Sequence, residues 1–225
     1  GPHQPRRPLR PADSLLEGPQ TERQFPLLPH PLEHRLDLGE LARFGEVVED
    51  PLAHGFLGSV KWAYDVYRIP LVGRLIPLYI DWNWPGVRCS ALGRTCWIDE
   101  QAKASLESGV GQVVILGAGY DCRAYRLSGM EGARVFEVDH PNTLAVKTGR
   151  LKGLLGSLPG HVSFVEVNFD MQDFSLLLRD SGFDPSIPSF FIWEGVMHYL
   201  TADAVDRTFA LISSLSAPGS RLAFT

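Results

Sequence analysis

Residues 113–127 read VVILGAGYDCRAYRL, an apolar run followed by a turn with two glycines. The apolar residues are typical of a buried strand, and those after Asp121 are typical of a helix. Gly117 and Gly119 let the backbone turn tightly and approach a ligand closely. Cys122 stands where the dinucleotide fingerprint has its third glycine, so a pyrophosphate is not the obvious ligand. The turn alone is a weak signal, because many such turns only join a strand to a helix.

Short apolar strands and helices alternate downstream of this turn. That alternation is typical of a parallel sheet with helices on both faces, so we expect a doubly wound α/β fold over residues 111–225. Helices are expected after Asp121, from Pro141, over 173–181 and after Thr201 as N-cap. The expected strands span residues 113–116, 134–139, 162–167, 189–194 and 220–225.

The residues before the sheet have a different texture. Residues 1–31 contain eight of the seventeen prolines, so we expect an extended or disordered arm. Apolar stripes at helical spacing, such as Ile98, Ala102 and Leu106 before Gly109, predict a helical cap over residues 32–110. The sequence stops inside the fifth expected strand, so we expect a missing segment or a second chain to complete the sheet.

Composition excludes several classes of protein. The 225 residues are 44% hydrophobic and 21% charged, with a net charge of −5, which is ordinary for a globular protein and gives no basic surface for nucleic acid. The longest apolar region is too short and too polar to span a bilayer. Cys89, Cys96 and Cys122 match no zinc spacing, so we expect no metal and a reducing, cytoplasmic setting. Cys122 fits a packed residue better than a nucleophile.

Acidic residues stand at the ends of the expected strands, where parallel sheets bind ligands. Asp139 lies twenty residues beyond Gly119, the distance at which a carboxylate accepts hydrogen bonds from a ribose, with Glu137 as second choice. Asp139 could instead cap the helix that begins at Pro141. Glu194 ends an apolar strand and needs a charged partner or several donors.

The third strand is followed by residues 168–173, NFDMQD, in which a carboxylate beside a free backbone N–H suits an adenine edge. An equally good interpretation makes Asp170 or Asp173 a helix N-cap. Hydroxyls, an amino-purine edge and a positive charge occur together in S-adenosylmethionine. Its carboxylate needs a cation, which Arg94 could supply unless it is a plain surface residue.

Five motifs together resemble the leucine carboxyl methyltransferase family: LGAGYDCRAYRL at 116–127, FEVDHP at 136–141 and WEGVMHYL at 193–200, with DPLA at 50–53 and RTCWID at 94–99. The resemblance covers about residues 46–225 and implies a Rossmann-like methyltransferase fold. Members of the family continue into further strands and substrate-binding elements. The implied cofactor contacts are Arg94 to the carboxylate, Gly117 near the methionyl part, Asp139 to the ribose, Asp170 and Met171 to the adenine, and Glu194 to the amine. Ala118 and Gly119 of the same turn are also expected to bind the cofactor.

The predicted function is therefore an S-adenosylmethionine-dependent O-methyltransferase that acts on a carboxylate of a small molecule or a protein C-terminus. A carboxylate needs no base, whereas a hydroxyl acceptor would need one, for which His198 and Tyr199 are candidates. Tyr199 could equally be a packed aromatic residue. An NAD-dependent oxidoreductase and a cofactor-binding module without activity remain as alternatives.

Other residues near these motifs have two interpretations each. Arg123 and Arg126 lie one helical turn apart and could orient an acidic acceptor, although salt bridges to neighbouring acids are the simpler expectation. Asp121 is expected to cap the helix that follows it. Trp82 and Trp84 could line an acceptor pocket or pack within the cap.

Overall fold

The computed structural model describes residues 50–56, 62, 66, 69–169 and 172–225, which all belong to one compact unit, residues 38–225. The proline-rich arm predicted over 1–31 lies outside the described residues. Most of residues 32–68, at the start of the predicted cap, also lie outside the described residues.

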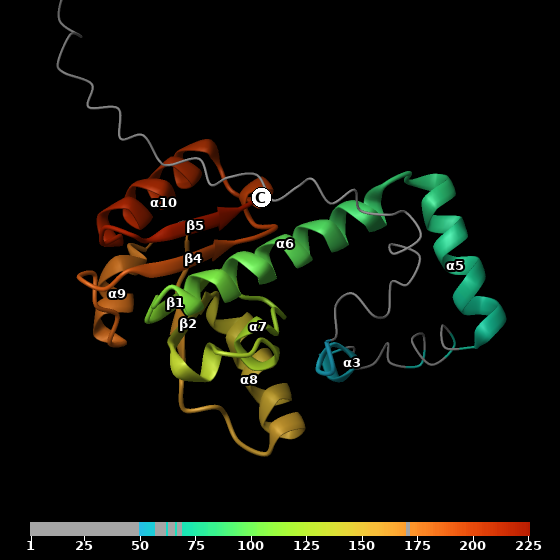
Figure 1. Cartoon of the computed structure of the whole chain (residues 1–225), viewed down its shortest axis with the longest axis horizontal. Helices are drawn as coiled ribbons and strands as arrows, with labels where there is room; N and C mark the ends of the chain where they lie inside the picture. The colour runs from blue at the N-terminus through green and yellow to red at the C-terminus, as the bar shows by residue number, and fades with distance from the viewer. Residues whose placement is uncertain (1–49, 57–61, 63–65, 67–68, 170–171) are drawn as a thin grey trace, which may run out of the picture. The chain divides into compact units, whose positions relative to one another are not determined.

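A five-stranded parallel sheet forms the centre of this unit (Figure 1). The strand order is β3-β2-β1-β4-β5, so the order reverses between β1 and β4. Ile115 of β1 lies opposite Glu137 of β2 and Ile192 of β4. Every predicted strand is confirmed, with ends within one residue of those expected. The strands are β1 (Gln112–Leu116), β2 (Arg134–Asp139), β3 (Val162–Glu166), β4 (Ser189–Trp193) and β5 (Arg221–Phe224).

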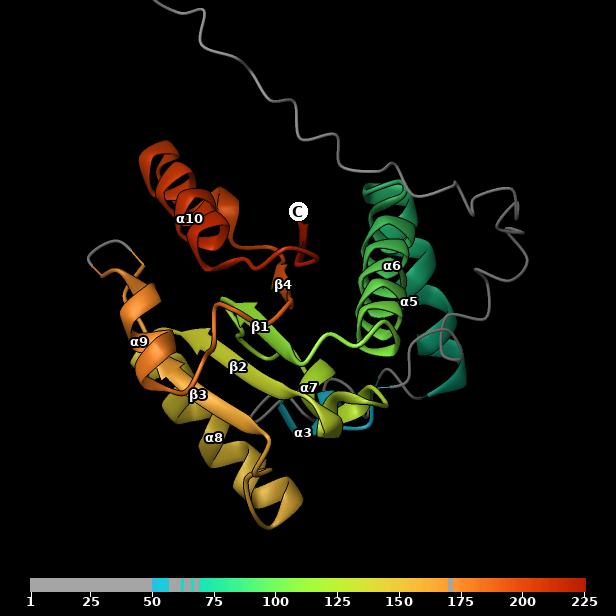
Figure 2. The same cartoon turned by 60° about the vertical axis from the view of Figure 1, so that its left-hand side comes forward.

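Helices cover both faces of the sheet, which confirms the doubly wound fold. Figure 2 shows α9 and α10 on one side of the sheet and α6 and α7 on the other. Thr201 caps α10 as predicted, because its hydroxyl accepts a hydrogen bond from the Ala204 N–H at 3.2 Å. The described helices are α3 (Ala53–Phe56), α5 (Pro70–Asn83), α6 (Val87–Glu107), α7 (Arg123–Arg126), α8 (Pro141–Leu155), α9 (Phe174–Asp180) and α10 (Ala202–Leu215), with the 3₁₀ turns η2 (Met130–Gly132) and η3 (Met197–Tyr199).

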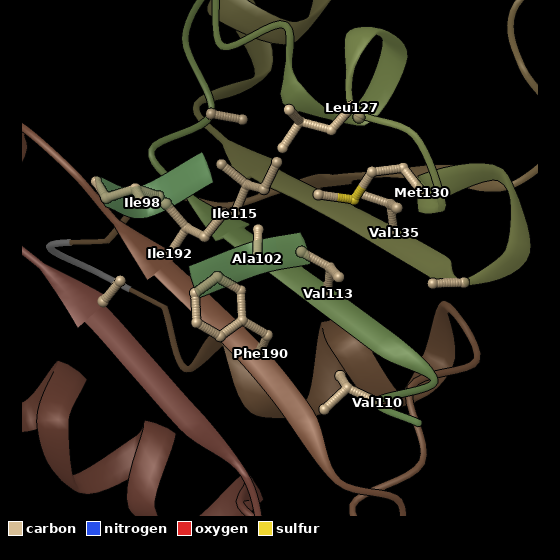
Figure 3. Packing of buried hydrophobic residues seen from close by; sticks show 14 of the residues in the cluster. Ile98, Ala102, Val110, Val113, Ile115, Leu127, Met130, Val135, Phe190 and Ile192 are labelled. Carbon is tan, nitrogen blue, oxygen red and sulfur yellow. The ribbon is translucent and has the colours of Figure 1, made fainter. Parts of the chain in front are cut away.

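Alternate residues of each strand point into two separate cores, as the pleat requires. Val113 and Ile115 face the core beneath α6, where Ile98 and Ala102 are fully buried (Figure 3). Val114 and Leu116 face the opposite core, which α9 and α10 cover. The last helix of the predicted cap therefore packs directly on the sheet.

The short helix α3 packs near the start of α7. Phe56 lies in a small buried cluster with Cys122 and with Leu151 of α8. Within the described part of the chain, no helix is long and apolar enough to cross a membrane.

Candidate functional site

A cavity of about 330 Å³ opens at the carboxyl ends of β1 and β4, where the strand order reverses. Cofactors bind at this point in open α/β sheets, and the volume lies within the range of small-molecule sites. The cavity is lined by residues of α6, β1, α7 and β4, by the loops that follow β1 and β4, and by Asp50. The lining residues are Asp50, Arg94, Thr95, residues 115–123, Arg126, Ile192, Glu194 and Gly195.

The glycine turn forms one wall of this cavity. Gly117 has φ +67° and Gly119 has φ +40°, a region that favours glycine. A Cβ atom at Gly117 would also collide with the side chain of Val196. The Gly117 and Ala118 N–H groups donate to the Val138 carbonyl at 2.8 and 3.1 Å, which ties the turn to the end of β2.

Asp139 holds the same turn from its other side. Its Oδ2 accepts a hydrogen bond from the Gly119 N–H at 2.6 Å, and its Oδ1 accepts one from the His140 N–H at 2.6 Å. The alternative role as cap of α8 is wrong, because His140 is the N-cap and accepts from the Asn142 N–H through Nδ1 at 3.3 Å. The Asp139 carboxylate therefore lies against the glycine turn, but Asp139 is not among the described residues that line the cavity.

Glu137, the second choice for a ribose contact, is wrong for that role. The residue is fully buried on the α8 side of the sheet, and its Oε2 lies 2.7 Å from the Lys147 ammonium. Burial raises the pKa of the Glu137 carboxyl to about 7, although Lys147 opposes the rise. Glu137 is therefore an internal partner of Lys147.

Lys147 is a supporting residue that the sequence interpretation missed. Its ammonium donates to the carbonyls of Ala118 at 3.3 Å and Asp121 at 2.8 Å, at the two ends of the turn. The position of Lys147 in the sequence could have indicated that it is buried. Lys147 follows Leu144 by three residues and precedes Leu151 by four, on the apolar stripe of α8.

Glu194 has the charged partners that its place in the sequence required. Its Oε1 accepts a hydrogen bond from Nε of Arg94 at 2.7 Å, and its Oε2 accepts one from the Arg123 guanidinium at 2.7 Å. Arg94 and Glu194, which the sequence assigned to the two ends of a methionyl group, are thus paired with one another in the lining of the cavity.

The ion pairs continue behind Glu194. Nε of Arg123 donates to Asp99 at 2.7 Å, and its Nη1 donates to Asp121 at 2.6 Å. Arg126 donates to both oxygens of Asp99, at 2.6 and 3.0 Å. The expectation of salt bridges for Arg123 and Arg126 is confirmed.

Arg123 stays charged in this position. Burial acts to lower the pKa of its guanidinium, but Asp121, Glu194 and Asp99 outweigh burial and raise that pKa. The sequence interpretation quoted Asp99 only as part of a motif, and the structure buries it on α6 next to Ile98. The expectation that Asp121 caps the following helix is wrong, because Cys122 is the N-cap of α7; the Asp121 carboxylate accepts from the Arg123 N–H at 2.7 Å.

Asp170 and Met171, the predicted adenine contacts, lie outside the described residues. Asp173 is the N-cap of α9 and accepts from the Ser175 N–H at 2.8 Å, which confirms that interpretation.

Cys122 is buried, and burial together with Asp50 raises the pKa of its thiol to about 12. A thiol with this pKa is no nucleophile at neutral pH.

His198 and Tyr199 lie on η3 and are not among the described residues that line the cavity. Their rings are in contact, with centroids 4.1 Å apart. Tyr199 is 80% exposed, so the alternative of a packed aromatic is wrong.

Trp82 and Trp84 are also exposed, and Trp84 contacts the ring of Tyr79 edge-on. Among the described residues, no group of three or more His, Cys, Asp or Glu side chains could hold a metal ion.

The fold and the site define a Rossmann-like α/β domain with a cavity at its topological switch point. The chain belongs to the leucine carboxyl methyltransferase family, whose sequence pattern matches residues 41–213. A relative from Mycolicibacterium gilvum (strain PYR-GCK), named as an S-adenosyl-L-methionine-dependent methyltransferase, is 37% identical over 184 residues, which are 79% of this chain and 59% of that protein.

Two further similarities agree with this. A protein of the same name from Mycobacterium bovis (strain BCG / Pasteur 1173P2) is 38% identical over 181 residues, 79% of this chain and 58% of its own. The chain thus spans under two thirds of the length of these relatives. A Thermobifida fusca crystal structure titled as a methyltransferase shares the fold, with TM-score 0.51, 24% identity, and coverage of 68% of this chain and 59% of that chain.

Proposed function

We propose that the protein binds S-adenosylmethionine in the cavity at the ends of β1 and β4 and transfers its methyl group to an oxygen acceptor. The observation that supports this most strongly is the Arg94–Glu194 ion pair, at 2.7 Å, in the lining of the cavity. A zwitterionic methionyl group needs a cation for its carboxylate and an anion for its amine, and Arg94 and Glu194 can supply them once the ligand replaces their mutual contact.

The rest of the cofactor extends along the glycine turn in this proposal. The Gly117, Ala118 and Gly119 backbone permits close approach of the ligand. The Asp139 carboxylate, already beside Gly119, accepts hydrogen bonds from the ribose hydroxyls. Asp170 and Met171 remain the proposed adenine contacts.

The proposed reaction is an in-line displacement at the methyl carbon. A lone pair of the acceptor oxygen forms the new C–O bond while the C–S bond breaks, and its electrons stay on sulfur, so the products are a methyl ester and S-adenosylhomocysteine. The acceptor is a carboxylate of a small molecule or of a protein C-terminus, which is ionised at neutral pH and needs no base. Alignment of the reactants then carries much of the catalysis.

A hydroxyl acceptor would require a base, for which His198 and Tyr199 remain the proposed residues. Cytoplasmic location also remains a proposal, supported by free thiols at Cys89, Cys96 and Cys122.

Calorimetric titration tests the cofactor assignment directly. We expect S-adenosylmethionine and S-adenosylhomocysteine to bind and NAD not to bind, because Cys122 replaces the glycine that a pyrophosphate site needs. Binding of NAD alone would overturn the proposal in favour of an oxidoreductase. Methyl transfer from labelled cofactor to a panel of carboxylic acids and C-terminal peptides then tests the acceptor; cofactor binding with no transfer to any of them would indicate a binding module.

A further inference from the structure

Glu194 is held by two arginines that differ sharply in their surroundings. Arg94, on the outer side, has a side chain that is 41% exposed and contacts Oε1 of Glu194. Arg123, on the inner side, is only 4% exposed and contacts Oε2. The two oxygens of one carboxylate are thus divided between a partly exposed arginine and a buried one.

Arg123 is fixed from three directions. Its Nε bonds Asp99 of α6, and its Nη1 bonds both Asp121 of the glycine turn and Glu194 at the end of β4. The planar fork of the guanidinium serves these three acceptors through donors on two nitrogens, Nε and Nη1, whose directions are fixed relative to one another. The side chain therefore joins three elements that line the cavity.

The network is electrically balanced before any ligand enters. Arg94, Arg123 and Arg126 face Asp99, Asp121 and Glu194, so three positive charges meet three negative ones. A methionyl zwitterion adds one charge of each sign. It can replace the Arg94–Glu194 contact by two new ion pairs without leaving any charge unpaired.

We propose that Arg123 is a positioning residue that fixes Oε2 of Glu194 and thereby presents Oε1 to the amine of the cofactor. Arg94 correspondingly leaves Oε1 and takes the cofactor carboxylate. The Arg94–Glu194 contact occupies the site until the ligand replaces it, whereas the Arg123–Glu194 contact persists. This inference rests on the proposed binding of S-adenosylmethionine.

Two ligands separate a positioning role from a merely structural one. S-adenosylhomocysteine carries the amine and the carboxylate, whereas methylthioadenosine has the same adenosine and sulfur but neither charge. Arg123→Lys keeps the charge and loses the fork. We expect it to weaken S-adenosylhomocysteine about tenfold, the size of a coupling between neighbouring charged groups, and methylthioadenosine less than about twofold.

Arg134→Lys is the matched control, because Arg134 bonds Gln112 at the start of β1 and is not one of the described residues that line the cavity. This variant should leave the ratio of the two affinities as in the wild type. Equal weakening of both ligands by Arg123→Lys, or no weakening of either, would overturn the inference. In addition, Arg123→Lys should have no further effect on S-adenosylhomocysteine once Glu194→Gln is present, since Arg123 acts through Glu194.

The wild-type protein supplies a test that needs no variant. In ¹⁵N spectra of the arginine Nε–H groups, S-adenosylhomocysteine should shift the Arg94 signal and leave the Arg123 signal protected from exchange, and methylthioadenosine should shift neither. An unchanged Arg94 signal or loss of the Arg123 signal would refute the proposal that the cofactor replaces the Arg94–Glu194 contact and leaves the Arg123–Glu194 contact in place. Wild-type protein that binds neither ligand would instead refute the proposed cofactor, so the two failures are distinct.

Discussion

Single residues at the cavity and beside the glycine turn meet two requirements, one on backbone conformation and one on charge. Gly117 meets the first, because it combines a positive φ with a close approach to Val196. Glu194 and Asp139 meet the second, because each places a carboxylate at the end of a buried strand. These requirements are local, so substitution of one residue should change cofactor binding without altering the order of the strands.

Gly117→Ala should reduce both stability and cofactor binding. The new methyl group adopts a disfavoured backbone region and meets Val196, at a cost of about 1–3 kcal/mol in the free energy of unfolding. Urea unfolding and titration with S-adenosylhomocysteine measure the two effects. Gly149→Ala is the control, since a Cβ there meets nothing within 4 Å in helix α8. Equal behaviour of the two variants would contradict this account.

Glu137 predicts a pH dependence of stability. Burial raises its pKa to about 7 in the folded protein, whereas an unfolded glutamate titrates near about 4.3. Between these values the folded state binds more protons than the unfolded state. The contribution of this group is therefore complete below about pH 4.3 and is lost as the pH rises through about 7, by on the order of 3 kcal/mol.

Glu137→Gln removes the titrating group. The free energy of unfolding of this variant should therefore fall less between pH 5 and pH 8 than that of the wild type. Urea titrations across that range measure the difference in slope. Glu166→Gln, on an exposed position of β3, should keep the wild-type dependence. Parallel curves for Glu137→Gln and the wild type would show that another group is responsible.

The sequence predicted the acids at strand ends better than their supports. Asp139 and Glu194 could be found because each ends an apolar run, and the pleat and parallel order then fix where they lie. Lys147 and Asp99 could not be assigned in the same way, because each partner is distant along the chain. Lys147 reaches Glu137 on β2, and Asp99 reaches Arg123 on α7. A buried charge on an apolar stripe signals that some partner exists without naming it.

At the scale of elements, local signals were sufficient. The strand ends follow apolar runs bounded by glycine, proline or charge, and the helices begin where Pro141, Asp173 and Thr201 predicted them. Longer-range geometry was less accessible. The apolar stripe of α6 indicated a helix, but only the structure shows that Ile98 and Ala102 pack into the core of the sheet.

Helix α10 offers a test of capping at the scale of an element. Thr201→Ala removes the oxygen that accepts from the Ala204 N–H, so the free energy of unfolding should fall by about 1 kcal/mol. Thr201→Ser keeps the hydroxyl and should retain most of the stability. Thermal unfolding of both variants measures the loss. If serine were as destabilising as alanine, the methyl group of Thr201 rather than its cap would be responsible.

The whole molecule brings the site together from segments that are far apart in the sequence. Arg94 belongs to α6 and Glu194 follows β4, one hundred residues later, yet their side chains meet at 2.7 Å. The sheet order places β1 and β4 side by side, and α6 packs across the same face. The prediction that a further segment or second chain completes the sheet beyond β5 stays a prediction.

A ligand that contacts all these segments must stabilise the folded unit as a whole. At one hundred times its dissociation constant, S-adenosylhomocysteine should add about 2.7 kcal/mol to the free energy of unfolding. For a unit of this size that corresponds to a rise in Tm of roughly 5–10 °C. Differential scanning fluorimetry measures the shift. NAD at the same concentration is the control and should leave Tm unchanged, and Arg94→Gln should reduce the shift because the ligand carboxylate loses its partner. A shift with NAD but none with S-adenosylhomocysteine would contradict the cofactor assignment.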